Sequence, residues 1–231
     1  MNRMRPKLIA ITGGSGAGKS WLADKLEQLF EGQAQRLCLD AFYLDRSHLT
    51  PQSRARINYD HPRCIDWSLA AATLQQLKLG RPVQLPCYDF ATHCRTPGKV
   101  SMTPKPVVLI EGLWLLHRPV VRRLFDLAIF LDCPATQRLR WRIARDTIER
   151  GRTEQSVRTQ FRSTVAPMHK LWVAPQREHA DVVLRQPLKA KDIDNLFERL
   201  WALLADDVIY PDTRRHAYLA RAKTLISKEG I

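Results

Sequence analysis

The sequence predicts an α/β protein built on a doubly wound, mainly parallel sheet that helices cover on both faces. Short apolar runs alternate with longer segments in which apolar residues recur at helical spacing. The first apolar run, residues 7–12, ends directly in a glycine cluster that precedes a helical pattern. A buried strand, a glycine-rich loop and a helix in that order are typical of nucleotide-binding α/β folds.

The predicted elements alternate along the chain. Short apolar runs bounded by polar or turn-forming residues predict strands, at residues 7–12, 35–39, 107–110, 127–131 and 181–184. Segments with one apolar face predict helices, at residues 19–30, 68–79, 135–150, 154–172 and 192–204. The proline-containing stretches 41–67 and 81–106 are predicted to be irregular, with a helical turn in the first and a hairpin in the second.

Length and composition predict one folded domain. The chain has 231 residues, of which 45% are hydrophobic and 26% charged, and these values exclude global disorder. We expect a single domain over residues 1–205 and a basic extension over 206–231, which is either an accessory helix or a frayed end. The formal net charge of +14 indicates an anionic partner, either nucleotide phosphates or nucleic acid.

The sequence favours a cytoplasmic location and no membrane partner. The longest apolar run, residues 107–116, is interrupted by Glu111 and falls short of the roughly 18–20 residues that cross a bilayer. Only residues 8–11 form an apolar core near the N-terminus, which is too short for a secretory signal. The five cysteines are scattered without a CxxC pair, so we expect reduced thiols rather than a disulfide framework or a zinc site.

The glycine cluster matches the phosphate-binding pattern GxxxxGK[ST] in the strand–loop–helix context that this pattern requires. Its residues are Gly13, Gly14, Ser15, Gly16, Ala17, Gly18, Lys19 and Ser20. Glycines let successive backbone N–H groups point toward a phosphate, and the helix N-terminus adds a partial positive charge. Lys19 is suited to bridge the β- and γ-phosphates, and the Ser20 hydroxyl to bind Mg²⁺. The sequence therefore predicts a site for ATP or GTP with Mg²⁺.

Two acidic residues are predicted at the edge of the sheet where α/β proteins bind ligands. Glu111 follows the 107–110 strand and is suited to hold Mg²⁺ directly or through water, or it is an ordinary solvated carboxylate at a strand end. Asp40 follows the 35–39 strand, where a carboxylate could accept the proton of a hydroxyl attacking the γ-phosphate. Aspartate also commonly ends strands without any catalytic role.

An arginine-rich segment predicts a lid over about residues 135–155. Its basic residues are Arg138, Arg140, Arg142, Arg145, Arg150 and Arg152, against Asp146 and Glu149. The first, third and fourth of these arginines share one helical face, which is suited to neutralise charge that develops on a transferring phosphoryl group. Contact with a nucleic-acid backbone is the less favoured alternative, because the chain contains no recognisable nucleic-acid-binding motif.

Seven segments resemble the uridine kinases of the phosphoribulokinase/uridine kinase group of P-loop kinases, in the same order along about residues 7–185. These segments are Gly13–Ser20, Asp40–Tyr43, Asn58–Pro62, Leu85–Arg95, Ile110–Gly112, Arg142–Asp146 and Glu149–Arg152. The most discriminating are NYDHP at residues 58–62 and YDFxxHxR at residues 88–95. The resemblance implies transfer of the γ-phosphate of ATP or GTP to the 5′-hydroxyl of uridine or cytidine.

The resemblance also implies roles for individual residues. Asp40 corresponds to the catalytic base, assisted by Lys19, and Arg145 to a catalytic lid arginine. The residues that match nucleoside contacts are Asp60 and Arg142 for the ribose hydroxyls, Tyr88 and His93 for the base, and Gln160 for a further contact. Arg150 and Arg152 correspond to further lid arginines that face the phosphates, and members of the group typically form homo-oligomers, tetramers or dimers.

The chain departs from the family pattern in two places, and two alternative functions are compatible with its sequence. The segment Arg185–Pro187 stands where the family often has a glycine-containing basic segment, and the extension after residue 205 is atypical. One alternative is a P-loop kinase of another small alcohol, such as pantothenate, a sugar phosphate or glycerate. The other is a P-loop protein that binds nucleic acid, for which salt-dependent retention on RNA or DNA would be diagnostic.

Overall fold

The computed structural model describes residues 5–205 and 215–227. Its centre is a five-stranded parallel sheet with the strand order β2-β5-β1-β6-β7. The strands are β1 (Lys7–Gly13), β2 (Ala34–Cys38), β5 (Val107–Gly112), β6 (Leu127–Asp132) and β7 (Val182–Arg185). Each predicted strand is confirmed, with ends displaced by no more than two residues.

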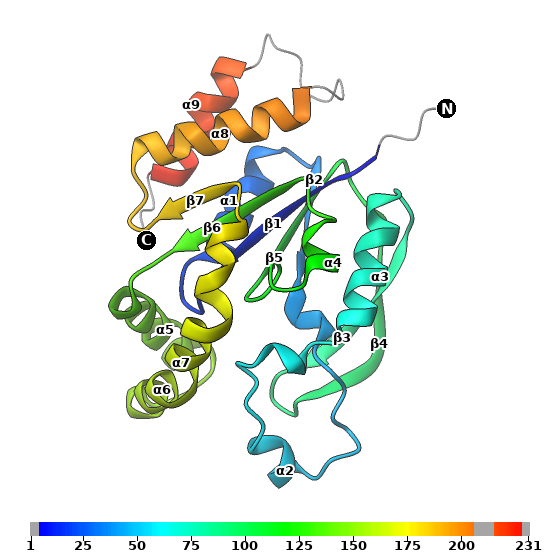
Figure 1. Cartoon of the computed structure of the whole chain (residues 1–231), viewed down its shortest axis with the longest axis vertical. Helices are drawn as coiled ribbons and strands as arrows, with labels where there is room; N and C mark the ends of the chain where they lie inside the picture. The colour runs from blue at the N-terminus through cyan, green and yellow to red at the C-terminus, as the bar shows by residue number, and fades with distance from the viewer. Residues whose placement is uncertain (1–4, 206–214, 228–231) are drawn as a thin grey trace.

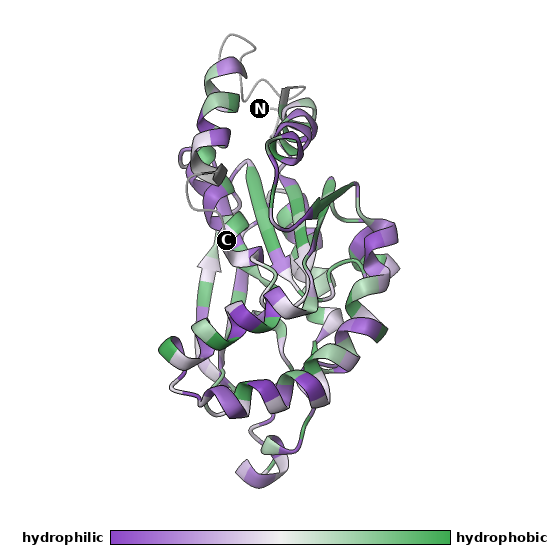
Figure 2. Cartoon of the chain, turned by 90° about the vertical axis from the view of Figure 1, so that its left-hand side faces the viewer, coloured by the Kyte–Doolittle hydropathy of each residue, from purple (hydrophilic) through white to green (hydrophobic). Residues whose placement is uncertain are grey.

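Helices cover both faces of this sheet, as predicted for a doubly wound fold (Figure 1). Side chains alternate across β1, so that Ile9 and Ile11 join the core on the side of α1 (Lys19–Leu29) and α8 (Ala190–Ala205). Leu8 and Ala10 join the opposite core, beside α3 (Trp67–Lys78) and the short α4 (Pro119–Arg122). The strands therefore bury both faces, and the hydrophobic colour in Figure 2 is concentrated on them.

A separate antiparallel hairpin is formed by β3 (Val83–Asp89) and β4 (Cys94–Met102). It lies in the stretch where the sequence predicts a hairpin, and α2 (Pro51–Ala55) is the helical turn expected within residues 41–67. Short 3₁₀ turns at Leu39–Phe42 and Pro62–Cys64 connect these segments. Figure 1 shows α2 and the far part of the hairpin at one end of the molecule, away from α8.

The arginine-rich segment forms α5 (Ala135–Glu149), followed by α6 (Glu154–Gln160) and α7 (Ala166–Met168). The predicted helix over 154–172 is continuous but uneven, with wider π-helical turns at Phe161–Val165 and His169–Val173 on either side of α7. Pro167 lies within α7 and lacks the N–H that a regular helix would use, which accounts for the wider turns. A 3₁₀ segment at Ala174–His179 then leads into β7.

At the C-terminal end, α9 (Arg215–Ser227) packs on α8 and on α1 (Figure 1). Ala222 is buried, and the ring of Tyr218 lies 6.1 Å from that of Trp201 in α8. The rest of the predicted extension, residues 206–214 and 228–231, lies outside the described residues. No described helix is long and apolar enough to span a bilayer.

Candidate functional site

The glycine-rich loop joins the end of β1 to the start of α1 and is tightly packed beneath α5. Gly16 has a φ of 77°, and a Cβ atom at this position would lie 2.4 Å from the carbonyl oxygen of Arg138. A Cβ on Gly14 would lie 2.7 Å from the side chain of Arg138 and 2.9 Å from Nδ1 of His169. Larger residues would therefore displace the loop or the lid helix. His169 is about 155 residues from the loop in the chain, so the sequence gives no signal for this contact.

Lys19, Asp40 and Glu111 come together at the carboxyl ends of β1, β2 and β5. The Lys19 ammonium donates to the carbonyl oxygen of Gly14 at 3.0 Å. Burial lowers the pKa of Lys19, while the charges of Glu111 and Asp40 oppose that shift. The pKa of Asp40 is raised by burial, an effect that Lys19 opposes and Glu111 reinforces. The structure thus places the predicted phosphate-binding lysine and the predicted base in one electrostatic group.

Ser20 and Glu111 offer an oxygen pair suited to a divalent cation. The Ser20 hydroxyl, at the start of α1, donates to Oε2 of Glu111 at 2.7 Å. Hydroxyl and carboxylate oxygens are the hard ligands that Mg²⁺ prefers. Among the described residues no group of three or more His, Cys, Asp and Glu side chains could hold a metal ion. An ion at this pair would therefore take further ligands from nucleotide phosphates and water, which is usual for Mg²⁺.

Cys38 is a neighbour of this group that the sequence analysis did not assign to the site. It is the last residue of β2, and its residue surface is exposed. Desolvation around the sulfur, followed by the charges of Asp40 and Glu111, raises the pKa of the thiol well above its ordinary 9.0. The thiol is therefore protonated at neutral pH.

The lid arginines converge on one carboxylate. Asp146 in α5 is fully buried, and its oxygens lie 2.8 Å from Arg145, 3.5 Å from Arg142, 3.7 Å from Arg150 and 3.5 Å from Arg152. The sequence suggests a helix face of positive charge directed at anions, but Asp146 balances part of the arginine charge inside the lid. Arg145 and Arg150 also lie close enough to Asp40 to lower its pKa, so this part of the lid lies near the predicted base.

Arg138 does not join that cluster, although helical spacing places it on the same face as Arg142 and Arg145. Its guanidinium is buried, lies 5.4 Å from the centre of the Phe161 ring, and donates through Nε to the carbonyl oxygen of Cys133. Arg138 therefore packs the lid helix against the glycine-rich loop rather than facing solvent.

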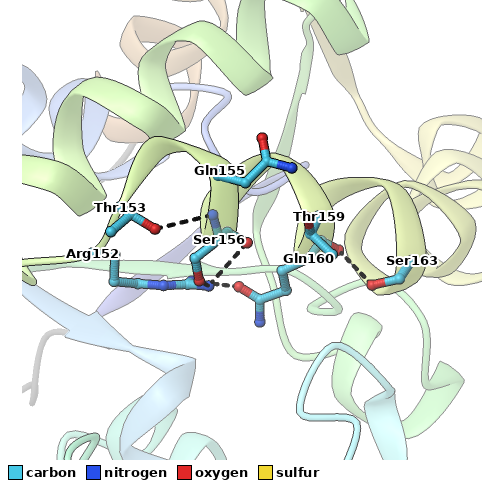
Figure 3. Close-up of a pocket in the computed structure, with 7 residues that line it drawn as sticks. All are labelled: Arg152, Thr153, Gln155, Ser156, Thr159, Gln160 and Ser163. Atoms are coloured by element: carbon cyan, nitrogen blue, oxygen red, sulfur yellow. Dashed lines mark hydrogen bonds between the residues drawn. The ribbon is translucent and has the colours of Figure 1, made fainter.

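Arg142 connects the lid to the loop and to α6. It donates to the Ser15 hydroxyl at 2.6 Å and to Oε1 of Gln160 at 2.8 Å. Arg152 shares the same Gln160 oxygen and also donates to the Ser156 hydroxyl. Figure 3 shows Arg152, Ser156 and Gln160 pointing toward one another beside an open pocket of about 610 Å³ along α6. Two of the predicted lid arginines, Arg142 and Arg152, are thus held with Gln160 in one hydrogen-bonded group.

The other three predicted nucleoside contacts, Asp60, Tyr88 and His93, lie in the 41–67 segment and the β3–β4 hairpin. Oδ2 of Asp60 accepts a hydrogen bond from the Thr164 hydroxyl at 3.0 Å, and the charge of Asp60 counteracts the lowering of the Arg142 pKa by burial. The Tyr88 hydroxyl lies 3.4 Å from Nδ1 of His93. Asp60 therefore lies close to the lid, and Tyr88 and His93 form a pair on the hairpin.

Three further aromatic residues complete this region, and the sequence analysis did not assign them. The Tyr59 and His93 rings are stacked, with centroids 3.9 Å apart and an interplanar angle of 9°. Tyr43 stacks on Tyr88 at 5.1 Å, and the Phe90 ring packs edge-on to Tyr88 at 5.3 Å. The available signal was their position, since each lies inside or directly beside a quoted motif.

His93 is held in an unusual environment. Its φ is 57°, a left-handed conformation at the end of the turn between β3 and β4. Burial and then the charge of Arg54 lower the pKa of the imidazole below its ordinary 6.5, and Asp89 opposes this. The ring is therefore neutral at pH 7 and offers one donor and one acceptor nitrogen to a ligand.

The chain is similar to proteins of one kinase family. The sequence model described as "Phosphoribulokinase / Uridine kinase family" matches residues 8–194. A uridine kinase of Brevibacillus brevis is 41% identical over 180 residues, which cover 78% of this chain and 84% of that protein. A uridine kinase of Shewanella sp. (strain W3-18-1) is 40% identical over 211 residues, covering 89% of this chain and all of that protein.

Solved structures show the same fold at lower sequence identity. A phosphoribulokinase from Rhodobacter spheroides has a TM-score of 0.60 at 17% identity, covering 79% of this chain and 70% of that one. A D-glycerate 3-kinase from Cryptococcus neoformans has a TM-score of 0.57 at 18% identity, covering 78% and 86%. The match to the family model spans most of the chain and includes the glycine-rich loop and the lid. The chain therefore belongs to the phosphoribulokinase/uridine kinase family.

Proposed function

We propose that the chain is an ATP-dependent kinase that transfers the γ-phosphate to the 5′-hydroxyl of uridine, and also of cytidine. One observation carries the proposal: although burial is the larger influence on both pKa values, the charge of Asp40 is close enough to both Lys19 and Tyr43 to raise the pKa of each. Tyr43 in turn stacks on Tyr88. A carboxylate thus links the phosphate-binding loop to the aromatic region, and relatives about 40% identical are named uridine kinase.

On the donor side, the backbone N–H groups of the loop and the N-terminus of α1 hold the phosphates, and Lys19 balances their charge. Ser20 and Glu111 would hold Mg²⁺, which when bound supplies positive charge to the β- and γ-phosphate oxygens. Burial lowers the pKa of Lys19, and the charges of Glu111 and Asp40 oppose that shift and favour the charged ammonium. These residues orient the γ-phosphate toward Asp40.

On the acceptor side, the Asp40 carboxylate takes the proton of the 5′-hydroxyl as its oxygen bonds to the γ-phosphorus. The bond from that phosphorus to the β,γ-bridging oxygen breaks, and the electron pair leaves with ADP. A raised pKa makes Asp40 a stronger base than an ordinary aspartate. Asp60 is suited to accept hydrogen bonds from the ribose hydroxyls, and Tyr88 and His93 to contact the base.

The lid supplies charge and excludes water. The side chains of Arg145, Arg150 and Arg152 remain 35%, 47% and 27% exposed, so some of their donors are free to face phosphate oxygens. Arg142 holds the lid to the loop through Ser15 and to α6 through Gln160. Arg142 and Gln160 also contact the bound nucleoside. Exclusion of water matters because water at the acceptor position would hydrolyse ATP.

The proposal is tested by coupled ADP release with Mg-ATP and a panel of acceptors: uridine, cytidine, adenosine, pantothenate, glycerate and ribulose 5-phosphate. We expect turnover with uridine and cytidine alone, and a repeat with GTP tests the donor. Turnover with another alcohol instead would show a different acceptor for the same chemistry. A flat response, with salt-dependent retention on RNA, would contradict the kinase proposal itself.

The physiological setting is also part of this proposal. We place the reaction in pyrimidine salvage in the cytoplasm, carried out by a homo-oligomer. Sedimentation equilibrium of the purified chain measures the assembly, and a monomer at micromolar concentration would contradict that element without affecting the chemistry.

A further inference from the structure

A second cavity, of about 500 Å³, lies where β7 ends and α8 begins. It is lined by Arg177, Arg185, Gln186, Lys189, Lys191 and Asp192, together with two apolar residues. β7 is the edge strand, and β6 separates it from β1, which carries the phosphate-binding loop. At about 5 Å per strand, the axis of β7 lies roughly 10 Å from that of β1.

The lining is strongly basic. Four cationic side chains contribute, and Arg177 has one acidic partner, Asp132, at 3.4 Å. The Asp192 carboxylate accepts the backbone N–H of Lys189 at 2.9 Å, so it caps the start of α8. No ion pair within the described residues involves Arg185, Lys189 or Lys191. Uncompensated positive charge around a concave surface attracts anions.

A buried amide strengthens this inference independently of the charges. Gln186 lines the cavity and is only 8% exposed, and its Nε2 has no hydrogen-bond partner among the described atoms. An unpaired buried donor is unfavourable, so most such groups in folded proteins are satisfied by a protein, water or ligand atom. Because Nε2 is itself buried, an oxyanion in the cavity would supply the missing acceptor after the Gln186 amide turns toward it. The N-terminus of the 16-residue α8 adds partial positive charge at the same place.

We propose that this cavity binds the phosphate group of a small phosphorylated metabolite, at a site separate from the donor nucleotide. Arginine and lysine donors with an amide suit tetrahedral oxyanions, and arginine can bind two phosphate oxygens at once. The volume is in the range of small-molecule pockets, which favours a small ligand over a nucleic-acid backbone. This inference goes beyond the kinase reaction and does not depend on the identity of its acceptor.

The experiment uses the full chain saturated with a non-hydrolysable ATP analogue and Mg²⁺, so that the glycine-rich loop is occupied. Inorganic phosphate, and in a second arm ribose 5-phosphate, is titrated at constant ionic strength and followed by calorimetry. The double variant Lys189→Gln/Lys191→Gln is compared with Lys99→Gln/Lys105→Gln, which removes the same charge from exposed positions elsewhere. Gln186→Leu tests the amide by itself.

We expect binding to the analogue-loaded wild type, weakened about tenfold in Lys189→Gln/Lys191→Gln and less than twofold in the control pair. Tighter binding of ribose 5-phosphate than of phosphate would identify an organic phosphate as the occupant, and equal binding would identify the free anion. Loss of binding when the analogue is present would overturn the proposal, because the cavity would then be part of the donor site. Equal weakening in both double variants, or binding only of an RNA oligonucleotide, would also overturn it.

Discussion

Asp40 combines two properties that oppose each other, ionisation and burial. Because burial raises its pKa above the ordinary 3.8, the folded chain binds its proton more tightly than the unfolded chain does. The stability that this difference contributes is present below pH 3.8 and is lost as the pH rises through the folded pKa. Ionised Asp40 therefore destabilises the fold at neutral pH.

Asp40→Asn should accordingly separate catalysis from folding and from nucleotide binding. We expect turnover with uridine to fall at least about 10²-fold, because a positioned base contributes that much. Binding of an ATP analogue, measured by calorimetry, should change little, and the urea midpoint at pH 7.5 should be no lower than that of wild type. Parallel losses of turnover and nucleotide affinity would contradict the assignment of Asp40 as the base.

The pH dependence of kcat/KM follows from the same shift. Protonated Asp40 cannot accept the hydroxyl proton, so activity should fall as the pH is lowered through its raised pKa. The acid limb should therefore lie above 3.8, the ordinary value for aspartate. A limb at or below that value would contradict a raised pKa of Asp40 or its role as the base, because kcat/KM reports the pKa values of the free enzyme.

Asp146 organises the lid, and its removal should affect stability as well as activity. Asp146→Asn leaves the nearly buried Arg142 without its carboxylate partner, which should lower the free energy of unfolding by about 3 kcal/mol. This value is at the low end of the range for breaking a buried ion pair, because solvent screens the interactions of Asp146 with the other, more exposed arginines. The matched control is Glu154→Gln, which breaks an exposed pair with Arg158 and should cost less than about 0.5 kcal/mol by urea denaturation.

The sequence alone could identify the lid arginines but not the role of Asp146. Arg150 and Arg152 follow the end of α5, and the chain must turn before they can reach Asp146. Because both residues lie beyond the end of the helix, helical spacing does not predict their distance from the Asp146 carboxylate. The same limit applies to Arg138, whose contact with Gly14 connects segments more than 100 residues apart.

At the scale of elements, the β3–β4 hairpin presents His93 in a left-handed conformation that asparagine also tolerates. His93→Asn should therefore keep the turn while removing the stacking on Tyr59. We expect KM for uridine to rise about tenfold and KM for ATP to stay within twofold, measured by coupled ADP release. Lys99→Ala, in the exposed part of β4, is the matched control, and similar changes in both KM values would contradict base recognition by this turn.

The strands of the sheet were predictable because each is a short apolar run buried on both faces, which is a local property. For the segments 41–67 and 81–106, the sequence predicted only a helical turn and a hairpin, and not the contacts between them. Tyr43, Tyr59 and Phe90 come from three separate segments, and their contacts with Tyr88 and His93 depend on how these segments pack. The position of Tyr43 is fixed partly by its hydroxyl, which donates to the carbonyl oxygen of Tyr59.

At the scale of the whole molecule, α9 joins the end of the chain to its beginning. Arg221 pairs with Glu31 just after α1, and Lys223 pairs with Asp194 in α8 at 2.8 Å. Deletion of residues 206–231 should expose Trp201 and lower the free energy of unfolding by about 2 kcal/mol. Circular dichroism against urea concentration measures this change.

The control for that deletion keeps the helix and removes its ion pairs. Arg221→Gln/Lys223→Gln should cost less than about 1 kcal/mol, because these pairs are 42–51% exposed and surface pairs contribute little. A truncated chain as stable as the full chain would show that α9 does not support the main domain. The sequence left this segment open between an accessory helix and a frayed end, because a polar helix is stabilised mainly by its packing.

The order of the strands is also a property of the whole molecule that the sequence did not provide. β5 lies between β1 and β2 although it follows β2 by more than 60 residues. This crossover brings Glu111 beside Ser20 and Asp40. Asp40 and Glu111 could each be predicted from the strand that it ends, whereas their proximity to each other and to Ser20 depends on the order of the strands in the sheet.

The carboxylates around Cys38 have a consequence for redox chemistry. Alkylating agents and peroxides attack the thiolate rather than the thiol, so the exposure of a cysteine does not by itself make it reactive. Because desolvation and the adjacent carboxylates keep the Cys38 proton in place, this side chain is a poor nucleophile at neutral pH. We therefore expect the thiol beside the proposed base to resist oxidation and alkylation at neutral pH.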